Sequence, residues 1–322
     1  MNTIAEIASI IKTLKSAVIF THIRADGDTI GGAMALCRAM KKLGIPSEVV
    51  NEGEVPAKLF FLEGVDKISN KPALDGEGYI CIDTSDESRL GELQKLFSAG
   101  ARKGKPTINV DHHVSNTRYC KYNFVRERAS NCENVAELIK ELGVEEDKLI
   151  ADYLMMGMVT DSGGFSHRDV NGDTFRAAAT AMDGGADVER ITYEIFKKQS
   201  KARASMYAGV ISNLRYFLND ALAVALVPQE ALASCGLGQD ATEGIVDFAL
   251  SIDTVEVSVC LMEVKAGQYK ASLRSKGRVN VNEVARSFGG GGHVLASGCM
   301  FFGDIEEVYD RLQFAVAQAG NL

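Results

Sequence analysis

Short apolar segments alternate with longer amphipathic ones along the first half of the chain. Four of the short segments read as buried strands: residues 17–20, 47–50, 78–82 and 106–110. The stretches between them carry apolar residues at helical spacing, most clearly over 29–43, where Gly44 and Pro46 end the pattern. Strands separated by helices of this length predict an α/β fold with a mainly parallel sheet and helices on both of its faces.

The second half of the chain predicts a separate, smaller α/β domain. A strand, the two strands of a hairpin and a final amphipathic helix are expected at 222–227, 255–264, 268–274 and 305–317. The stretch 187–216 is helical in pattern and is interpreted as a connector. We therefore expect a first domain over 1–186 and a second over 217–322, with a cleft between them.

Composition and charge limit the kinds of partner that we expect this protein to bind. The chain has 322 residues and a net charge of −8, whereas proteins that hold long nucleic acids usually present a basic face. No apolar run approaches the ~20 residues that span a bilayer, and the first residues lack the features of a secretory signal. The seven cysteines are scattered without a CxxC pair, as expected of reduced thiols. We expect a cytoplasmic protein with a small ligand, without a membrane or long nucleic acid as partner.

Acidic and imidazole side chains follow three of the predicted strands and one predicted helix. They are His22, Asp26 and Asp28 after the first strand, Asp83 after the third, Asp111, His112 and His113 after the fourth, and Asp161 after a helix ending near residue 160. In an open parallel sheet, ligands bind beyond the carboxyl ends of the strands. These residues are therefore expected to converge on one edge of the sheet.

Spacing suggests what such a cluster holds. Asp26 and Asp28 are two residues apart and face the same way in an extended segment, so each can bind a different metal ion, with Asp83 bridging the two. The first ion would take His22 and Asp26, and the second would take His112 and Asp161. Imidazole and carboxylate ligands without cysteine suit Mn²⁺ or Mg²⁺ better than structural zinc. Two ions ~3.5–4 Å apart can polarise a phosphoryl oxygen and activate water.

Each of these residues also has a purely structural interpretation. Asp28 before Thr29 fits a helix N-cap, Asp83 fits a turn, and His112 and His113 fit hydrogen-bonded structural histidines. A set of caps and turns would leave several like charges unpaired on one sheet edge, which costs stability unless cations neutralise them. The metal interpretation is therefore favoured for the set as a whole.

Four ordered motifs of this chain resemble those of the DHH phosphoesterase superfamily. They are the run from His22 to Asp28, Asp83, Asp111-His112-His113 followed by Asn116, and Asp161-Ser162-Gly163-Gly164-Phe165. The second half is similar to the associated DHHA1 domain through 272–277 and the glycine run 289–292 ending at His293. The resemblance spans nearly the whole chain. Two departures, Ala25 where proline is frequent and Ser162 where threonine is usual, remove no ligand.

The resemblance implies a metal-binding catalytic domain and a substrate-binding domain. It implies six metal ligands, namely His22, Asp26, Asp28, Asp83, His112 and Asp161. Asp83, Asp111 and His113 are assigned to catalysis, with His113 contacting the scissile phosphate and protonating the leaving oxygen. In the second domain, the backbone of the glycine run, Arg274, Ser275 and His293 are expected to hold a phosphate, the glycines being Gly290, Gly291 and Gly292.

Length and domain pairing look most like the nanoRNase and pAp-phosphatase branch. The implied activity is hydrolysis of RNA of about two to five nucleotides, or of pAp to AMP, with two divalent ions, Mn²⁺ first and Mg²⁺ or Co²⁺ as alternatives. Short RNA or DNA oligonucleotides or a nucleoside bisphosphate would be the substrate, and a homodimer is compatible with this reading. Hydrolysis of cyclic di-AMP or pApA is the main alternative. A RecJ-like exonuclease and a non-catalytic nucleotide-binding protein are favoured less.

Overall fold

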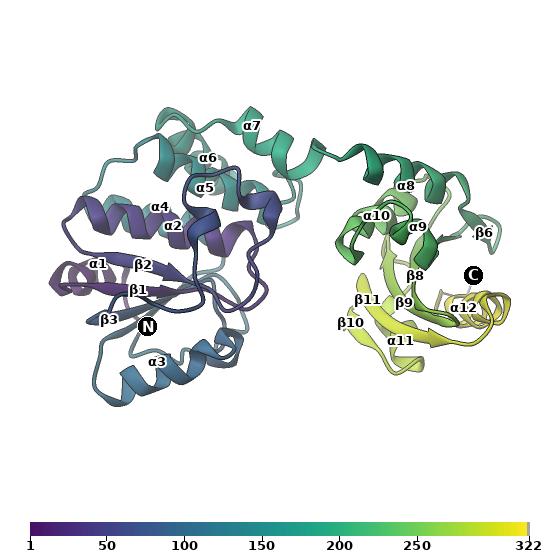
Figure 1. Ribbon diagram of the computed structural model, residues 1–322, viewed down its shortest axis with the longest axis horizontal. Coiled ribbons are helices and arrows are strands. Elements are labelled where there is room, and N and C mark those ends of the chain that lie inside the picture. The colour runs from purple at the N-terminus through teal and green to yellow at the C-terminus, as the bar shows by residue number, and fades with distance from the viewer. Residues whose placement is uncertain (321–322) are drawn as a thin grey trace. The chain divides into compact units, whose positions relative to one another are not determined.

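The computed structural model describes residues 1–320 and divides the chain into two compact units (Figure 1). Unit 1 comprises Met1–Lys198, and unit 2 begins at Gln199. The division falls within the stretch 187–216 that was interpreted as a connector. Each unit has its own sheet and its own hydrophobic core, so the two are described separately.

Unit 1 is built on a five-stranded sheet with the strand order β2-β1-β3-β4-β5. The strands are β1 (Ala17–Phe20), β2 (Ser47–Val50), β3 (Gly78–Ile82), β4 (Thr107–Asp111) and β5 (Tyr122–Val125). Every neighbouring pair is parallel. The predicted parallel sheet is confirmed, and its carboxyl edge carries the motifs that follow β1, β3 and β4.

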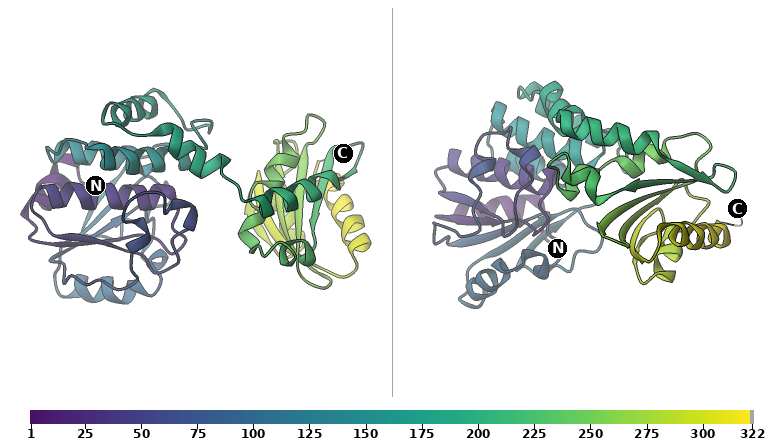
Figure 2. Two further views of the ribbon diagram at one scale, coloured as in Figure 1. Left: turned by 45° about the horizontal axis from the view of Figure 1, so that its top comes forward. Right: turned by 45° about the vertical axis from the view of Figure 1, so that its right-hand side comes forward.

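Helices cover both faces of this sheet (Figure 2). They are α1 (Ile4–Thr13), α2 (Gly27–Lys42), α3 (Leu93–Arg102), α4 (Asn131–Glu141), α5 (Lys148–Asp161), α6 (Gly172–Asp183) and α7 (Val188–Thr192). Short 3₁₀ turns form at Ala57–Leu59, Val65–Lys67 and Glu87–Leu90, and a π-helical turn forms at Tyr193–Lys197. Helices α2 and α3 lie in the crossovers from β1 to β2 and from β3 to β4, as expected of parallel pairing, because each crossover must return to the same end of the sheet.

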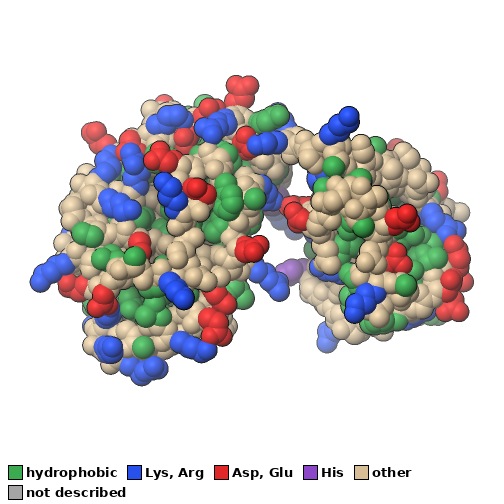
Figure 3. All heavy atoms as spheres, viewed as in Figure 1, with side chains coloured by type: hydrophobic (Ala, Val, Ile, Leu, Met, Phe, Trp, Pro, Cys, Tyr) green, Lys and Arg blue, Asp and Glu red, His purple; other side chains and the backbone are tan. Residues whose placement is uncertain are grey.

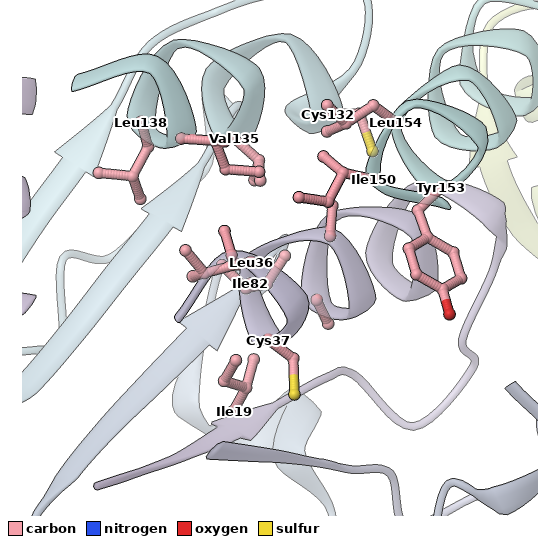
Figure 4. Packing of buried hydrophobic residues seen from close by; sticks show 14 of the residues in the cluster. Ile19, Leu36, Cys37, Ile82, Cys132, Val135, Leu138, Ile150, Tyr153 and Leu154 are labelled. Carbon is pink, nitrogen blue, oxygen red and sulfur yellow. The ribbon is translucent and has the colours of Figure 1, made fainter. Parts of the chain in front are cut away.

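Alternation along the buried strands divides the core of unit 1 into two layers. Ile19 and Ile82 point to the side of α2, where Leu36 and residues of α4 and α5 pack on them (Figure 4). Phe20 points to the opposite side and meets Phe97 of α3 edge to face, with ring centroids 5.7 Å apart. Because both faces of the sheet are covered, the central strands β1 and β3 are buried at every position.

Sequence periodicity missed one strand and one α-helix of unit 1 and misplaced some element boundaries. β5 and α1 were not predicted. Helix α2 begins at Gly27 instead of residue 29, because Asp26 and not Asp28 is its N-cap, accepting hydrogen bonds from the backbone N–H groups of Asp28 and Thr29. In the helical stretch between the predicted strands at 78–82 and 106–110, Gly91, whose φ of +59° is left-handed, separates the turn Glu87–Leu90 from α3.

Unit 2 contains a six-stranded sheet in the order β10-β11-β9-β8-β7-β6. The strands are β6 (Arg215–Phe217), β7 (Leu222–Val227), β8 (Val257–Lys265), β9 (Gln268–Ser275), β10 (Gly291–His293) and β11 (Ala296–Phe302). The pairs are antiparallel except β7 with β8. The predicted hairpin is confirmed as β8 and β9, whereas β6, β10 and β11 were not predicted.

Helices also lie on both faces of the unit 2 sheet. One apolar layer joins the sheet to α11 (Val281–Ser287) and α12 (Ile305–Gly320). The other joins it to α8 (Lys201–Ser212), α9 (Gln229–Ala233) and α10 (Ile245–Leu250). A short 3₁₀ turn, Gln239–Thr242, precedes α10. Unit 2 is thus the smaller α/β domain that the sequence predicted.

Charged side chains of both signs are interspersed on the face of unit 1 seen in Figure 3, without a continuous basic band on that face. Within residues 1–320, none of the helices combines the length and apolar character needed to cross a bilayer.

Candidate active site

The first group of polar side chains lies where β1 passes into α2. His22 is 2% exposed, and its Nε2 lies 3.7 Å from Asp26 Oδ2. Asp26 caps α2 through Oδ1, which accepts from the N–H groups of Asp28 and Thr29 at 3.1 Å each. One carboxylate therefore fixes the helix start with one oxygen and presents the other oxygen to His22.

Asp83 occupies the turn immediately after β3 and is 2% exposed. Its Oδ2 lies 3.6 Å from His22 Nε2, and its Oδ1 lies 3.4 Å from His112 Nε2. The buried Oδ1 has no hydrogen-bond partner. The backbone of Asp83 is left-handed, with φ of +57°, which is a conformation that aspartate tolerates better than most residues. Asp83 is therefore a turn residue, and its carboxylate also lies where the metal interpretation requires one.

The two histidines after β4 are oriented by different partners. His112 Nδ1 lies 2.9 Å from the carbonyl oxygen of Arg128, which can only accept, so Nδ1 carries the hydrogen and Nε2 faces Asp83. His113 Nδ1 lies 2.8 Å from Oδ1 of the fully buried Asp111. The same reasoning leaves His113 Nε2 free for a further partner.

Asp161 completes the cluster from the last residue of α5. Its Oδ2 lies 3.6 Å from His112 Nε2. The loop after it is held by His167, whose Nδ1 lies 2.8 Å from the carbonyl oxygen of Asp161. The neighbouring Arg168 is exposed. His167 thus supports the backbone of a candidate ligand.

The N-terminus of α4 holds Asp28, a contact that sequence reasoning missed. Asp28 is 1% exposed and accepts hydrogen bonds from Ser130 Oγ (2.8 Å) and from the N–H groups of Asn131 (2.6 Å) and Cys132 (2.9 Å). These donors and the positive end of the helix dipole stabilise its carboxylate. The Ser130 cap before a periodic helix was readable in the sequence, but its contact with a residue 102 positions earlier was not.

Asp83 belongs to one triad of potential ligand atoms, and its Oδ1 faces His112 of a second triad. His22, Asp26 and Asp83 offer atoms within 4.8 Å of one another, and so do Asp28, His112 and Asp161. A third grouping joins Asp83 to both His112 and His113. His22 Nδ1 and Asp83 Oδ1 are buried polar atoms without hydrogen-bond partners. Nitrogen and oxygen donors of this kind, with buried acids facing one another, fit divalent cations.

Burial and mutual repulsion shift the pKa values of the acids in this cluster. Burial and the charge of Asp83 raise the pKa of Asp28 to about 6, and burial with the charge of Asp28 raises the pKa of Asp161 to about 8. Burial also acts on Asp83, but its contacts with His112 and His22 outweigh that effect and lower its pKa. The cluster therefore has more negative charge than its own histidines neutralise.

The histidine pKa values respond to the same charges. Burial lowers the pKa of His112, but its contact with Asp83 and the charge of Asp28 outweigh burial and raise it to about 11. The hydrogen bond to Asp111 raises the pKa of His113. Both imidazoles are therefore drawn towards their charged form by neighbouring carboxylates.

The substrate-binding residues predicted in unit 2 lie on or beside β9 and β10. Arg274 Nε lies 3.3 Å from Asp247 Oδ1, and Ser275 Oγ lies 3.2 Å from Glu256 Oε1. His293 is exposed at the end of β10. Arg274 and Ser275 thus both have acidic neighbours within unit 2.

The glycine run has steric reasons for most of its members. A Cβ on Gly290 would lie 2.1 Å from the carbonyl oxygen of Gly298, and one on Gly292 would lie 2.6 Å from that of Ala296. Gly289 is left-handed, with φ of +75°. At Gly291 an added Cβ would meet only Asn282 Oδ1, at 3.8 Å. Gly290 and Gly292 are therefore required by the close pairing of this segment with β11, which the sequence did not reveal.

Two family models match the chain, one in each unit. Residues 16–158 match the DHH family, N-terminal domain, and residues 219–319 match the DHHA1 domain. The first match contains every candidate ligand except Asp161. The chain therefore belongs to the DHH/DHHA1 phosphoesterases and is a hydrolase of phosphate esters.

Several curated proteins that are similar to this chain over most of its length carry one name. The chain is 29% identical over 320 residues to a bifunctional oligoribonuclease and PAP phosphatase NrnA of Thermus thermophilus, covering 97% of this chain and 93% of the relative. It is 28% identical to a probable enzyme of the same name from Streptococcus mutans, covering 97% and 99%. An exopolyphosphatase-related protein from Bacteroides fragilis has the same fold, with a TM-score of 0.87, 25% identity, and coverage of 99% and 96%. Among DHH/DHHA1 proteins, the chain is thus similar to the oligoribonuclease and PAP-phosphatase branch.

Proposed function

We propose that the protein uses two divalent metal ions, Mn²⁺ first among them, to hydrolyse phosphate esters of short nucleotides. The substrates would be RNA of about two to five nucleotides, cut to mononucleotides, and pAp, converted to AMP. The observation that carries the proposal is the position of Asp83, whose two oxygens face the histidines of two separate ligand triads. The names of the Thermus and Streptococcus relatives support the choice of substrate.

Six residues would hold the ions. His22 and Asp26 would hold one, Asp28, His112 and Asp161 the other, and Asp83 would contact both. Two such ions supply Lewis-acid polarisation of a phosphoryl oxygen and a nucleophilic water at neutral pH. The protein's part is to fix these donors before the ions arrive. The carbonyl of Arg128 sets the His112 tautomer, and the α4 N-terminus holds Asp28.

His113 would act on the leaving group. Its Nδ1–H donates to the buried Asp111, so its Nε2 is the nitrogen available to the substrate. The raised pKa of His113 favours the protonated ring, which can give a proton from Nε2 to the departing ester oxygen. Asp111 would not exchange the proton itself but would orient the ring and stabilise its positive charge.

Arg274, Ser275, His293 and the backbone around Gly291 would bind a substrate phosphate in unit 2. Arginine offers a planar fork for phosphate oxygens, and Gly291 has space on its side-chain position. A phosphate would compete with Asp247 for Arg274 and with Glu256 for Ser275. Substrate binding in this unit would therefore include the exchange of an internal carboxylate for a phosphate.

The proposal is tested by profiling purified protein with Mn²⁺ and then with EDTA. The panel contains a dinucleotide, a five-nucleotide RNA, pAp, pApA, cyclic di-AMP and a long single strand. We expect cleavage of the short RNAs and pAp that EDTA abolishes. Preference for cyclic di-AMP or pApA would move the protein to a signalling role, preference for the long strand would indicate a RecJ-like exonuclease, and no hydrolysis with Mn²⁺, Mg²⁺ or Co²⁺ would contradict the proposal.

A further inference from the structure

A buried asparagine on β4, Asn109, contacts the backbone on both sides of the Asp83 turn. Its side chain is fully buried, and its Nδ2 donates to the carbonyl oxygens of Cys81 (3.2 Å) and Thr84 (3.1 Å). Cys81 lies two residues before Asp83 in the chain, and Thr84 directly follows it. A single amide therefore spans the segment that carries the candidate bridging carboxylate.

This contact has a specific task because the turn is strained. Asp83 has a left-handed φ of +57°, and a residue in that region costs on the order of 1–3 kcal/mol unless its surroundings enforce it. Thr84 Oγ1 and Thr29 Oγ1 both donate to the carbonyl of Ile82, at 3.0 and 3.1 Å. The carbonyl of Thr84, which follows Asp83, accepts from Asn109 Nδ2 on the adjacent strand at 3.1 Å and from Asn116 Nδ2 at 3.5 Å.

The other end of Asn109 leads to the catalytic histidine. Asn109 Oδ1 accepts from Asn116 Nδ2 at 2.7 Å, and the same Nδ2 lies 2.5 Å from Asp111 Oδ2. Asp111 holds His113 through its other oxygen, Oδ1. A continuous chain of side-chain contacts thus runs from the Asp83 turn through Asn109, Asn116 and Asp111 to His113.

We propose that Asn109 and Asn116 form a positioning relay, a hydrogen-bonded pair of side chains that holds two parts of the active site in place relative to each other. Asn109 places the carboxylate of Asp83 for metal binding, and Asn116 places Asp111 and through it the imidazole of His113. In this proposal both asparagines act through these residues and contact neither substrate nor metal. This inference rests on the proposed function for the roles of Asp83 and His113, and it assigns the supporting residues that those roles require.

The Asn109 arm is tested by Mn²⁺ titration of Asn109→Ala, with free Mn²⁺ followed by its electron paramagnetic resonance signal. Loss of the amide should weaken Mn²⁺ binding about 10- to 100-fold, the usual effect of removing a residue that orients a ligand. The matched control is Asn123→Ala, which removes another buried asparagine whose amide donates to a backbone carbonyl, that of Cys120. Its Mn²⁺ affinity should stay unchanged at a similar loss of thermal stability.

The Asn116 arm is tested with two substrates that differ in leaving group. Asn116 is only half-buried, so Asn116→Ala is expected to fold and to keep its Mn²⁺ affinity. Its kcat should fall about 100-fold on pAp, whose leaving hydroxyl needs a proton, and much less on a p-nitrophenyl phosphate ester, whose leaving group does not. A purely structural defect would lower both rates equally.

Unchanged Mn²⁺ affinity in Asn109→Ala, or equal losses on both substrates in Asn116→Ala, would overturn the relay. If Asn109→Ala does not fold, Asn109→Ser, which keeps a hydroxyl donor, takes its place with an intermediate loss of affinity expected. Failure of the proposed function is distinguishable, because it appears in the wild-type protein as absent hydrolysis of the panel. The Mn²⁺ titrations would still report on the Asn109 arm.

Discussion

At Asp83, backbone conformation and side-chain chemistry restrict the same position. The left-handed φ of +57° disfavours residues with branched or bulky side chains, and the buried carboxylate faces two histidines. An alanine at this position would therefore change both the metal site and the strain of the turn. Asparagine separates the two effects, because it tolerates the left-handed region and removes only the charge.

Asp83→Asn is expected to keep the fold and to lose at least about a hundredfold in metal-dependent turnover, since direct ligands matter at least as much as the residues that orient them. The control is Asp220→Asn, which changes an exposed aspartate of similar backbone conformation, with φ of +68°. Turnover should be followed with a p-nitrophenyl phosphate ester, and thermal unfolding should show both variants folded. Full activity of Asp83→Asn would contradict the proposed bridging role of Asp83.

Among the secondary-structure elements, α4 supports the candidate site through its N-terminus, and its own sequence does not suggest this contact. Its cap, Ser130, accepts from the N–H group of Cys132 at 3.0 Å and donates to Asp28 Oδ1 at 2.8 Å. The helix start and the candidate ligand Asp28 are therefore fixed by the same hydroxyl.

Ser130→Ala should lose about 1 kcal/mol of stability as a cap and, in addition, about 10- to 100-fold in Mn²⁺ affinity. Ser200→Ala is the matched control, because Ser200 caps α8 by accepting from the N–H group of Arg203 and has no part in the candidate site. Calorimetric Mn²⁺ titration distinguishes the two variants. Equal Mn²⁺ affinities would show that Ser130 is only a cap.

The elements that sequence predicted well are those with an apolar pattern of their own. β1, β2 and β3 begin and end where predicted, because each is a short apolar run bounded by polar residues. The convergence of His22, Asp83 and His112 also followed from topology alone, since the carboxyl ends of parallel strands share one edge.

The elements and contacts that sequence missed depend on distant partners. β10 is made largely of glycine, and it becomes a strand only because its backbone pairs closely with β11. Ser130 and Asn109 reach the site through contacts with residues far away in the chain. A single sequence has no periodicity that reports such contacts. The convergence of the candidate ligands could therefore be predicted, whereas the residues that support them could not.

At the scale of the whole protein, the acidic cluster makes stability depend on pH and metal together. Asp161, with its pKa raised to about 8, and Asp28, with its pKa raised to about 6, favour the protonated form in the metal-free fold. Their contributions to stability are present below the unfolded pKa of about 4 and are lost as pH rises through these values. Asp83, with a lowered pKa, contributes in the opposite sense only under more acidic conditions.

Metal should compensate for this loss where the carboxylates are ionised. The difference in Tm between Mn²⁺-loaded and EDTA-treated protein is therefore expected to grow from pH 5.5 to pH 8, as measured by differential scanning fluorimetry. Using the difference at each pH cancels the titration of groups elsewhere in the protein. A difference that shrinks as pH rises would contradict the charge balance inferred for the site.

Substitutions of candidate site residues in the two units are expected to change different kinetic constants. Arg274→Ala should raise KM for pAp roughly 10- to 100-fold, the value of a hydrogen-bonded charge, while sparing hydrolysis of bis-p-nitrophenyl phosphate. Arg215→Ala is the control, because Arg215 is another unit 2 arginine paired with a carboxylate, that of Glu306. Equal loss on both substrates would remove Arg274 from phosphate binding.

The left-handed turn at Asp83 also determines which point mutations can inactivate the protein without unfolding it. One base change converts an aspartate codon to asparagine or glycine, and both residues accept the backbone of this turn. Such alleles would yield abundant, folded and inactive protein, where most other lesions at a buried position reduce abundance as well. A mutational scan scored separately for abundance and for activity should therefore diverge at codon 83, with asparagine and glycine retained in the first score and depleted in the second.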